Sequence, residues 1–194
     1  MSTNMKKRLI KLGIKTTTRP GECTHLVAKS IVRTEKFLCA LAVAPFILTE
    51  EWATGSAKAG KILPEDNYML SDPDAEKKWK FKFSDALARS KSEGGPRSFA
   101  GMTFCITPKV AIDNKLLKNV VTAAGGTVQT ASSPTTRSLK GKENRYVISC
   151  PDDISIWRPL VQGGFTVYSP ELLLTGVLRQ EIDWEDKANM ITGK

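Results

Sequence analysis

Apolar residues along this chain switch between helical spacing and short continuous runs. Met5, Leu9 and Leu12 lie at i, i+4 and i+7, which predicts one buried helix face that ends at Gly13. Runs such as residues 46–48 are typical of short buried strands, and each is followed by a segment with helical spacing. Alternating helices and strands predict an α/β fold in which a parallel sheet is flanked by helices.

The predicted elements of the first half recur in the second half. A helix closed by glycine, then strand, helix, strand and helix, are expected in both. The repeat is too long for a solenoid and indicates a domain duplication. We therefore predict a first module over residues 1–72, a linker with a short helix over 73–97, and a second module over 98–194.

Hydroxyl residues stand where three of the predicted helices begin. Thr34, Thr49 and Ser169 each precede a helical segment, and Ser169 is followed by Pro170. Serine and threonine are favoured at this position because the side-chain oxygen accepts a backbone N–H of the first turn. We expect all three residues to act as helix caps.

The charge of the chain favours an anionic partner without choosing one. There are 29 Lys and Arg against 20 Asp and Glu, a formal net charge of +9. Short basic clusters lie at residues 6–8 and 77–82, and each is about as well explained by a solvated surface as by a binding patch. No apolar run is long enough to span a bilayer and no signal peptide is recognisable. We expect a soluble intracellular protein that makes no membrane contact.

The residues that usually carry catalysis or bind metals are sparse. The four cysteines form no CxxC pair, and His25 is the only histidine. We therefore expect no metal site and no cofactor. There is no glycine-rich phosphate loop and no nucleophile–histidine arrangement, so an enzyme is the least favoured interpretation. Reduced thiols suit a cytosolic or nuclear protein.

Several of these segments resemble a known family. Residues 24–27, the block 33–41 and the strand leading to Trp52 look like the first half of a tandem BRCT pair, and residues 101–181 look like its partner. The likeness is strongest to the C-terminal pairs of checkpoint mediators and fungal repair scaffolds that read a phosphorylated histone tail. The resemblance implies a monomeric, nuclear, phosphoserine-binding module of the DNA-damage response.

The same resemblance implies which residues bind the ligand. Lys36 matches the lysine that contacts the phosphate, and Thr34 lies beside it. Arg33 matches the arginine that meets the peptide's C-terminal carboxylate, three residues after the phosphoserine, and Thr175 matches a position lining the groove between modules. Independently, a helix start attracts anions and disfavours a lysine, so a bound phosphate would relieve Lys36. The alternative is that Arg33 and Lys36 are solvated side chains.

The resemblance fails at one point, which keeps two other functions open. In the family the first module opens with a strand whose hydroxyl and backbone complete the phosphate pocket, and here that strand would precede Met1. We expect the first module to lack it, with Ser2 or Thr3 as a possible substitute hydroxyl. One alternative function is weak DNA binding through the basic loop 137–145. The other is a structural interaction module without a phosphate pocket.

Overall fold

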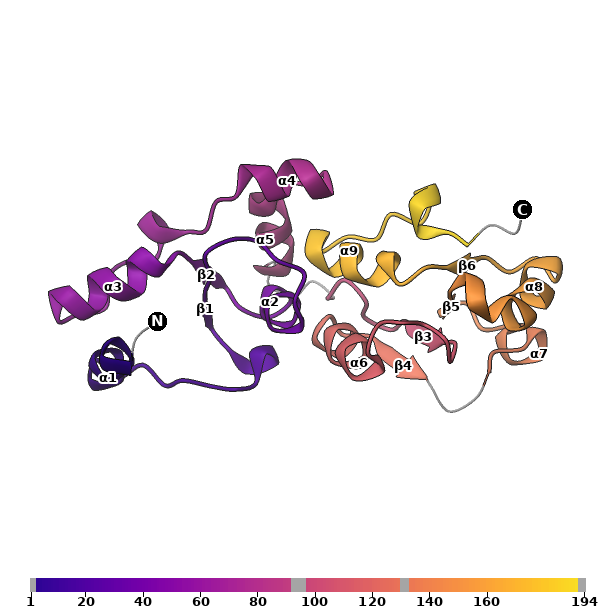
Figure 1. Ribbon diagram of the computed structural model, residues 1–194, viewed down its shortest axis with the longest axis horizontal. Coiled ribbons are helices and arrows are strands. Elements are labelled where there is room, and N and C mark those ends of the chain that lie inside the picture. The colour runs from indigo at the N-terminus through magenta and orange to yellow at the C-terminus, as the bar shows by residue number, and fades with distance from the viewer. Residues whose placement is uncertain (1–2, 92–96, 130–132, 192–194) are drawn as a thin grey trace. The chain divides into compact units, whose positions relative to one another are not determined.

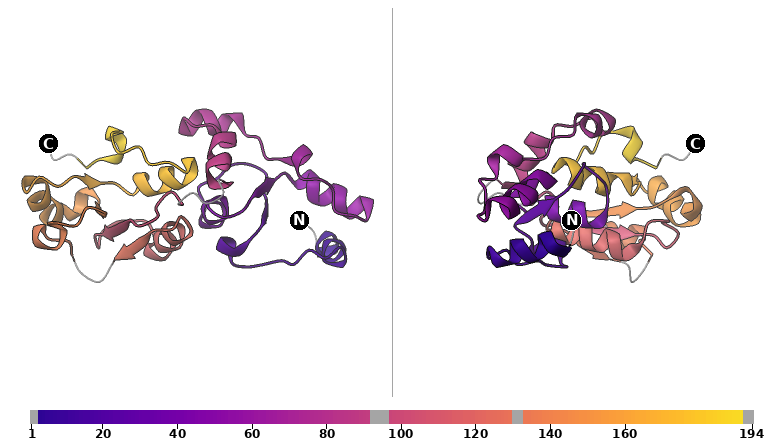
Figure 2. Two further views of the ribbon diagram at one scale, coloured as in Figure 1. Left: turned by 180° about the vertical axis from the view of Figure 1, so that it is seen from behind. Right: turned by 60° about the vertical axis from the view of Figure 1, so that its left-hand side comes forward.

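Internal contacts divide the chain into unit 1 (Met1–Lys91) and unit 2 (Ser92–Lys194). The structure is a computed structural model, and it describes residues 3–91, 97–129 and 133–191. Figures 1 and 2 show that each unit carries helices around a small sheet. None of the helices in these ranges is both long and apolar enough to cross a bilayer.

Unit 1 is built on two parallel strands, paired so that Leu26 lies opposite Ile47. Residues 16–21, expected as a loop or a weak strand, form a loop that ends in the first residues of η1. The described elements of the unit are α1 (Thr3–Lys11), η1 (Pro20–Glu22), β1 (His25–Val27), α2 (Glu35–Leu41), β2 (Phe46–Leu48), α3 (Glu50–Ala59), η2 (Asp66–Tyr68), α4 (Pro73–Trp79) and α5 (Phe83–Lys91).

One face of the β1–β2 sheet holds the core that α1 and α3 share. Leu9 of α1 and Trp52 of α3 are buried against Leu48 of β2. Since side chains alternate across a strand, Ile47 points to the other face and is fully buried there. Each short strand is thus apolar on both sides, which explains its continuous apolar run.

Unit 2 contains a four-stranded sheet in the order β4-β3-β5-β6, with every pair parallel. In Figure 1, α6 and α9 lie on one side of this sheet and α7 and α8 on the other. Its described elements are β3 (Thr103–Ile106), α6 (Asn114–Ala123), β4 (Thr127–Gln129), α7 (Thr136–Leu139), β5 (Arg145–Ile148), η3 (Pro151–Asp153), α8 (Ile154–Gln162), β6 (Val167–Tyr168), α9 (Glu171–Arg179) and η4 (Lys187–Asn189).

The two units repeat the same hydrogen bonds, which confirms the duplication. The backbone N–H of Ala28 donates to the carbonyl of Leu48 at 2.9 Å, and that of Ser149 donates to Tyr168 at 2.8 Å. In each unit, the segment after the helix that follows the last strand (α3 or α9) returns and forms an antiparallel bridge to that strand. By this equivalence β1 corresponds to β5, and β2 to β6. The predicted fold class, two small parallel sheets flanked by helices, is confirmed.

The two sheets differ in size, as the sequence predicts. Within residues 3–91, unit 1 has no counterpart of β3 or β4, so β1 has a strand neighbour on one side only. Leu26 and Val27 are therefore half-buried, whereas their counterparts Val147 and Ile148 are buried to 1% and 0% exposure.

The segment expected to be a linker contains two helices. α5 matches the short helix predicted there, and α4 precedes it. Asp72 caps α4 by accepting the backbone N–H of Ala75 at 3.0 Å, with Pro73 in the first turn. Contacts group both helices with unit 1.

Two of the three predicted caps are wrong. Thr49 stands directly before α3, but its side chain accepts no backbone N–H of that helix. Ser169 accepts no backbone N–H of α9 with its side chain, and its hydroxyl instead donates to the carbonyl of Ala188 at 3.5 Å. The returning segment after α9 lies beside this residue and supplies that acceptor. The hydroxyl thus fastens the end of the chain to the sheet instead of capping the helix.

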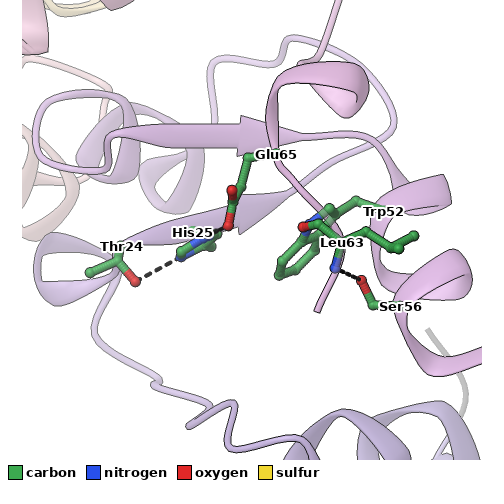
Figure 3. A network of polar contacts seen from close by, with 6 residues as sticks. All are labelled: Thr24, His25, Trp52, Ser56, Leu63 and Glu65. Atoms are coloured by element: carbon green, nitrogen blue, oxygen red, sulfur yellow. Dashed lines mark hydrogen bonds and ion pairs between the residues drawn. The ribbon is translucent and has the colours of Figure 1, made fainter. Parts of the chain in front are cut away.

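The only histidine is half-buried and packs among aromatic side chains of unit 1. The ring of His25 stacks on Phe46 and Trp52, with centroids 4.9 and 5.2 Å away. Its Nδ1 hydrogen-bonds the Thr24 hydroxyl at 2.8 Å, and its Nε2 lies 3.3 Å from a Glu65 carboxylate oxygen (Figure 3). Both ring faces and both nitrogens have protein partners, so the ring fastens the segment after α3 to β1.

The segment after α3 is held to the rest of unit 1 at a second residue, Leu63. Its carbonyl accepts the indole N–H of Trp52 at 2.9 Å, and its backbone N–H donates to the buried hydroxyl of Ser56 at 3.1 Å (Figure 3). Both contacts come from α3, so this helix determines where the loop runs. Leu63 thereby stays packed against the α1–α3 core.

We predict that His25→Ala lowers the free energy of unfolding by roughly 1–3 kcal/mol, because the variant removes two ring stacks of about 0.5–1.5 kcal/mol each. Urea denaturation measures this. Glu65→Gln is the matched variant and should cost less than about 1 kcal/mol, since it removes only a partly exposed charge. If both variants lowered the free energy of unfolding equally, the stabilisation would come from the contact between His25 and Glu65 and not from ring stacking.

A second prediction concerns alkaline pH. Burial, with a smaller contribution from the Glu35 carboxylate, raises the pKa of Cys39 to about 11. An unfolded thiol ionises near about pH 8.5. Its contribution to stability is therefore complete below that pH and is lost as pH rises toward about 11. We expect the unfolding free energy of Cys39→Ala to fall less between pH 8 and 10.5 than that of the unmodified chain. Parallel curves would contradict this assignment.

Candidate functional site

The candidate site lies where α2 begins. Thr34 has extended backbone angles, and its hydroxyl accepts the backbone N–H of Phe37 at 3.4 Å, which confirms the predicted cap. Beyond Thr34 the chain turns helical because Phe37, Leu38 and Leu41 all bury against the unit. The positions before and within this first turn are left at the surface.

The structure brings Arg33, Thr34 and Lys36 together at this helix start. Thr34 and Lys36 are exposed, and Arg33 is half-buried and already has a partner within the protein. Glu35 is the one acidic residue in this stretch. The Thr34 oxygen accepts a bond within the helix, but its hydroxyl proton is still available for donation. The site thus offers two cations and one O–H donor to an anion.

The loop that leads into α2 is held by Asp72, a residue that the sequence analysis does not connect with this loop. One carboxylate oxygen of Asp72 accepts the backbone N–H of Ile31 at 2.8 Å, while the other caps α4. Ile31 is itself buried, at 2% exposure. Asp72 therefore fixes the approach to Arg33 and Thr34. The Asp72-Pro73 pair signals the helix start in the sequence, but nothing in the sequence reveals the second contact.

The corresponding helix start in unit 2 has the opposite charge. Asp153, buried to 2% exposure, stands before α8, and its carboxylate accepts the backbone N–H of Lys109 at 2.8 Å. The ammonium group of Lys109 donates to the carbonyl of Asp152 at 3.0 Å. An anion is thus already built into this position. This agrees with the sequence, which shows no basic residue where this helix begins.

The Thr107 hydroxyl, at the end of β3, also has a hydrogen-bond partner within the protein. Thr107 and Ser149 are fully buried, and their side-chain oxygens lie 2.8 Å apart in a hydrogen bond. Neither hydroxyl faces solvent. Unit 2 therefore contains the strand-end hydroxyl that unit 1 is expected to lack, but uses it to join β3 to β5.

The remaining predicted site residues lie elsewhere. Thr175 is half-buried in the middle of α9, in a different unit from Arg33, so the predicted groove between modules stays a prediction. Thr3 is the exposed first residue of α1. Ser2 lies outside the described residues. The substitute-hydroxyl hypothesis therefore remains untested at both positions.

Possible metal ligands are not clustered in the described chain, and three of its four thiols have raised pKa values. Across residues 3–91, 97–129 and 133–191, no three His, Cys, Asp or Glu side chains are grouped so that they could hold an ion. Burial raises the pKa of the Cys39, Cys23 and Cys105 thiols, which keeps them protonated at neutral pH.

Comparison with known proteins identifies both units. A family described as "BRCT domain" matches residues 97–187, and one described as "Regulator of Ty1 transposition protein 107 BRCT domain" matches residues 1–70. The human Mediator of DNA damage checkpoint protein 1 is 40% identical over 161 residues, which cover 83% of this chain. The chain spans only 7% of the length of that protein.

Solved structures agree with the sequence comparison. The BRCT5-BRCT6 domains of S. pombe Brc1 superpose with a TM-score of 0.82 and 28% identity, over 96% of this chain and 90% of theirs. A complex of Rtt107p with a phosphorylated histone has the same fold, with a TM-score of 0.71 at 15% identity, over 100% of this chain and 88% of that one. Matching family regions in both units, a shared two-unit fold and the internal repetition of hydrogen bonds lead to one assignment: the chain belongs to the BRCT family, as a tandem pair of BRCT modules.

Proposed function

We propose that this chain binds a phosphoserine-containing protein tail, with the phosphate held at the start of α2 by Lys36 and Thr34. The peptide's C-terminal carboxylate meets Arg33, and Thr175 lines the groove for the last peptide residue. In this proposal the phosphorylated tail is that of a histone, and the pair acts as a nuclear, monomeric binding module of a DNA-damage-response scaffold, without catalysis.

The observation that carries the proposal is the difference in charge between the two helix starts. Arg33 and Lys36 stand at α2, where Asp152 and Asp153 stand at the corresponding start of α8. The two copies of the fold thus carry charges of opposite sign at the same position. A phosphate would be attracted by the cations at the start of α2 and repelled by the carboxylates at the start of α8. At α2, a lysine can contact the phosphate as a point charge, and an arginine can make a bidentate contact to a carboxylate.

Two further points support the assignment. The loop before α2 is held by Asp72 and the helix by its Thr34 cap, so the cations stand on a pre-ordered backbone. The Rtt107p structure, which has the same fold, is described as a complex with a phosphorylated histone. Relatives such as the human Mediator of DNA damage checkpoint protein 1 favour the same setting.

The first test is Lys36→Ala, titrated with a phosphoserine peptide that ends three residues after the phosphate and with its unphosphorylated twin. We expect the variant to lose at least about tenfold in affinity for the phosphopeptide, since a hydrogen bond to a charged group contributes about 1.5–3 kcal/mol. Affinity for the twin should not change. Lys118→Ala, an exposed lysine of α6, is the control and should bind like the unmodified chain. If the unmodified chain binds both peptides equally, it is a structural interaction module and the proposal fails.

The second test separates the carboxylate from the phosphate. Arg33→Ala should weaken binding of the phosphopeptide with a free C-terminus by about tenfold or more, and should barely affect the amidated peptide, because only the free carboxylate accepts a bidentate contact. Arg33→Lys keeps the charge without the fork and should recover only part of the affinity. Equal weakening toward both peptides would exclude this role. Thermal unfolding of each variant checks that the existing contact of Arg33 is not needed for folding.

A further inference from the structure

The positive charge of the chain is concentrated in unit 1. That unit holds 17 Lys and Arg against 10 Asp and Glu, whereas unit 2 holds 12 against 10. Within unit 1 the excess lies near the start, since residues 3–21 contain six cations and no acidic residue. Arg19 forms an ion pair with Glu22 at 2.8 Å. The other five cations are Lys6, Lys7, Arg8, Lys11 and Lys15.

Four of these five cations lie on α1, and all are exposed. Leu9 faces α3 and is 4% exposed. At 100° per residue, Lys7 and Lys11 stand one turn apart on the side opposite Leu9, and Arg8 lies beside Lys11, whereas Lys6 lies on the other flank, nearer to Leu9. α1 lies beside α3 at the margin of unit 1 (Figures 1 and 2), and the exposure of Lys7 and Lys11 shows that their side of the helix is not covered by the unit.

This arrangement is not explained by the folding of unit 1 itself. In the part of the chain that the structure describes, no ion pair involves Lys6, Lys7, Arg8 or Lys11. Cations in the last turn of a helix are favourable, which accounts for Arg8 and Lys11 but not for Lys6 and Lys7. Like charges at i and i+4, such as Lys7 and Lys11, destabilise a helix by a few tenths of a kcal/mol. An external polyanion would remove this repulsion.

The duplicated unit provides an internal comparison. α6 occupies the place of α1 in unit 2, and its cations are Lys115 and Lys118. It begins at the acidic cap Asp113, and neither helix has an acidic residue in its first turn. The same framework therefore does not require a strongly basic helix at this position. The basic face is a property that α1 has and its copy lacks.

The chemistry of the face selects among polyanions. An acidic membrane would need an apolar helix face to insert, but Leu9 is already buried, and Ile10 is the one large apolar side chain of α1 that is strongly exposed, at 53%. No aromatic residue lies on α1, so the face cannot stack on unpaired bases. Four cations spread along a helix of about 13 Å suit a dense row of phosphates, such as the one charge per about 1.7 Å of duplex DNA.

The two other basic segments are less suited to this role. The cluster at residues 77–82 directly follows the acidic side chains of α4, and the ammonium group of Lys78 lies over the Trp79 ring. Residues 137–145, expected as a loop, instead include most of α7 and the first residue of β5, and Arg145 donates to the carbonyl of Ser138 at 3.4 Å. We propose that the exposed face of α1, centred on Lys7 and Lys11, binds the phosphate backbone of duplex DNA without sequence preference.

The test compares two double variants that remove the same charge. The affinity of each for a fluorescein-labelled duplex of mixed sequence is measured by anisotropy between about 50 and 200 mM NaCl. K7Q/K11Q should lower the affinity at the lower salt by about tenfold or more and reduce the slope of log K against log salt by about 2, one for each phosphate that is no longer neutralised. K115Q/K118Q should leave the slope unchanged. Unchanged thermal unfolding shows that both variants fold.

The remaining outcomes are equally decisive. The proposal is overturned if the unmodified chain does not bind the duplex at about 50 mM NaCl, if both double variants lose affinity equally, or if phosphatidylserine vesicles bind in preference to DNA. The phosphopeptide titration is run on the same proteins. K7Q/K11Q should keep phosphopeptide affinity and K36A should keep the salt slope, so failure of one proposal is distinguishable from failure of the other.

Discussion

The parallel pairing of two short strands is the constraint on which each unit depends. Parallel strands cannot be joined by a tight turn, so a helix must cross from one to the next, and the carboxyl ends of both strands meet at one edge of the sheet. In unit 1 this places the starts of α2 and α3 at the edge where β1 and β2 end. The same pairing of β5 with β6 places α8 and α9 equivalently. The candidate site exists because the fold must begin a helix there.

The duplication then shows how one framework acquires two roles. Both copies need a polar group at the start of the crossing helix, because the first N–H groups of a helix have no partner within it. Unit 1 uses the neutral Thr34, which leaves the surrounding charge to Arg33 and Lys36. In unit 2 the buried Asp153 stands before α8, but its carboxylate makes no cap hydrogen bond with that helix and instead accepts the backbone N–H of Lys109. An internal anion stabilises the second copy, and an external one suits the first.

Much of the fold follows from the sequence because burial repeats at regular spacing. The helices over residues 3–11, 35–41 and 114–123 could be predicted because apolar side chains recur on one face. The cap at Thr34 was predictable from local chemistry, while Ser169 was not, since its hydroxyl meets a segment that returns 19 residues later. The second contact of Asp72 could not be predicted for the same reason, because its partner Ile31 lies 41 residues earlier in the chain. Long-range polar contacts leave no spacing pattern to read.

The two cationic surfaces of unit 1 differ in the kind of anion that each can hold. At α2, two cations stand at one helix start where the backbone is fixed by Asp72, which suits the single phosphate and neighbouring carboxylate that we propose there. At α1, four cations spread along a helix without converging, a geometry for a row of phosphates. Binding of an anion would release few counterions at α2 and several at α1. A higher salt concentration should therefore weaken binding at α1 far more than binding at α2. One unit can therefore combine a discrete, modification-dependent contact with a diffuse one, and the diffuse contact would hold the module near DNA while the discrete contact selects the protein tail.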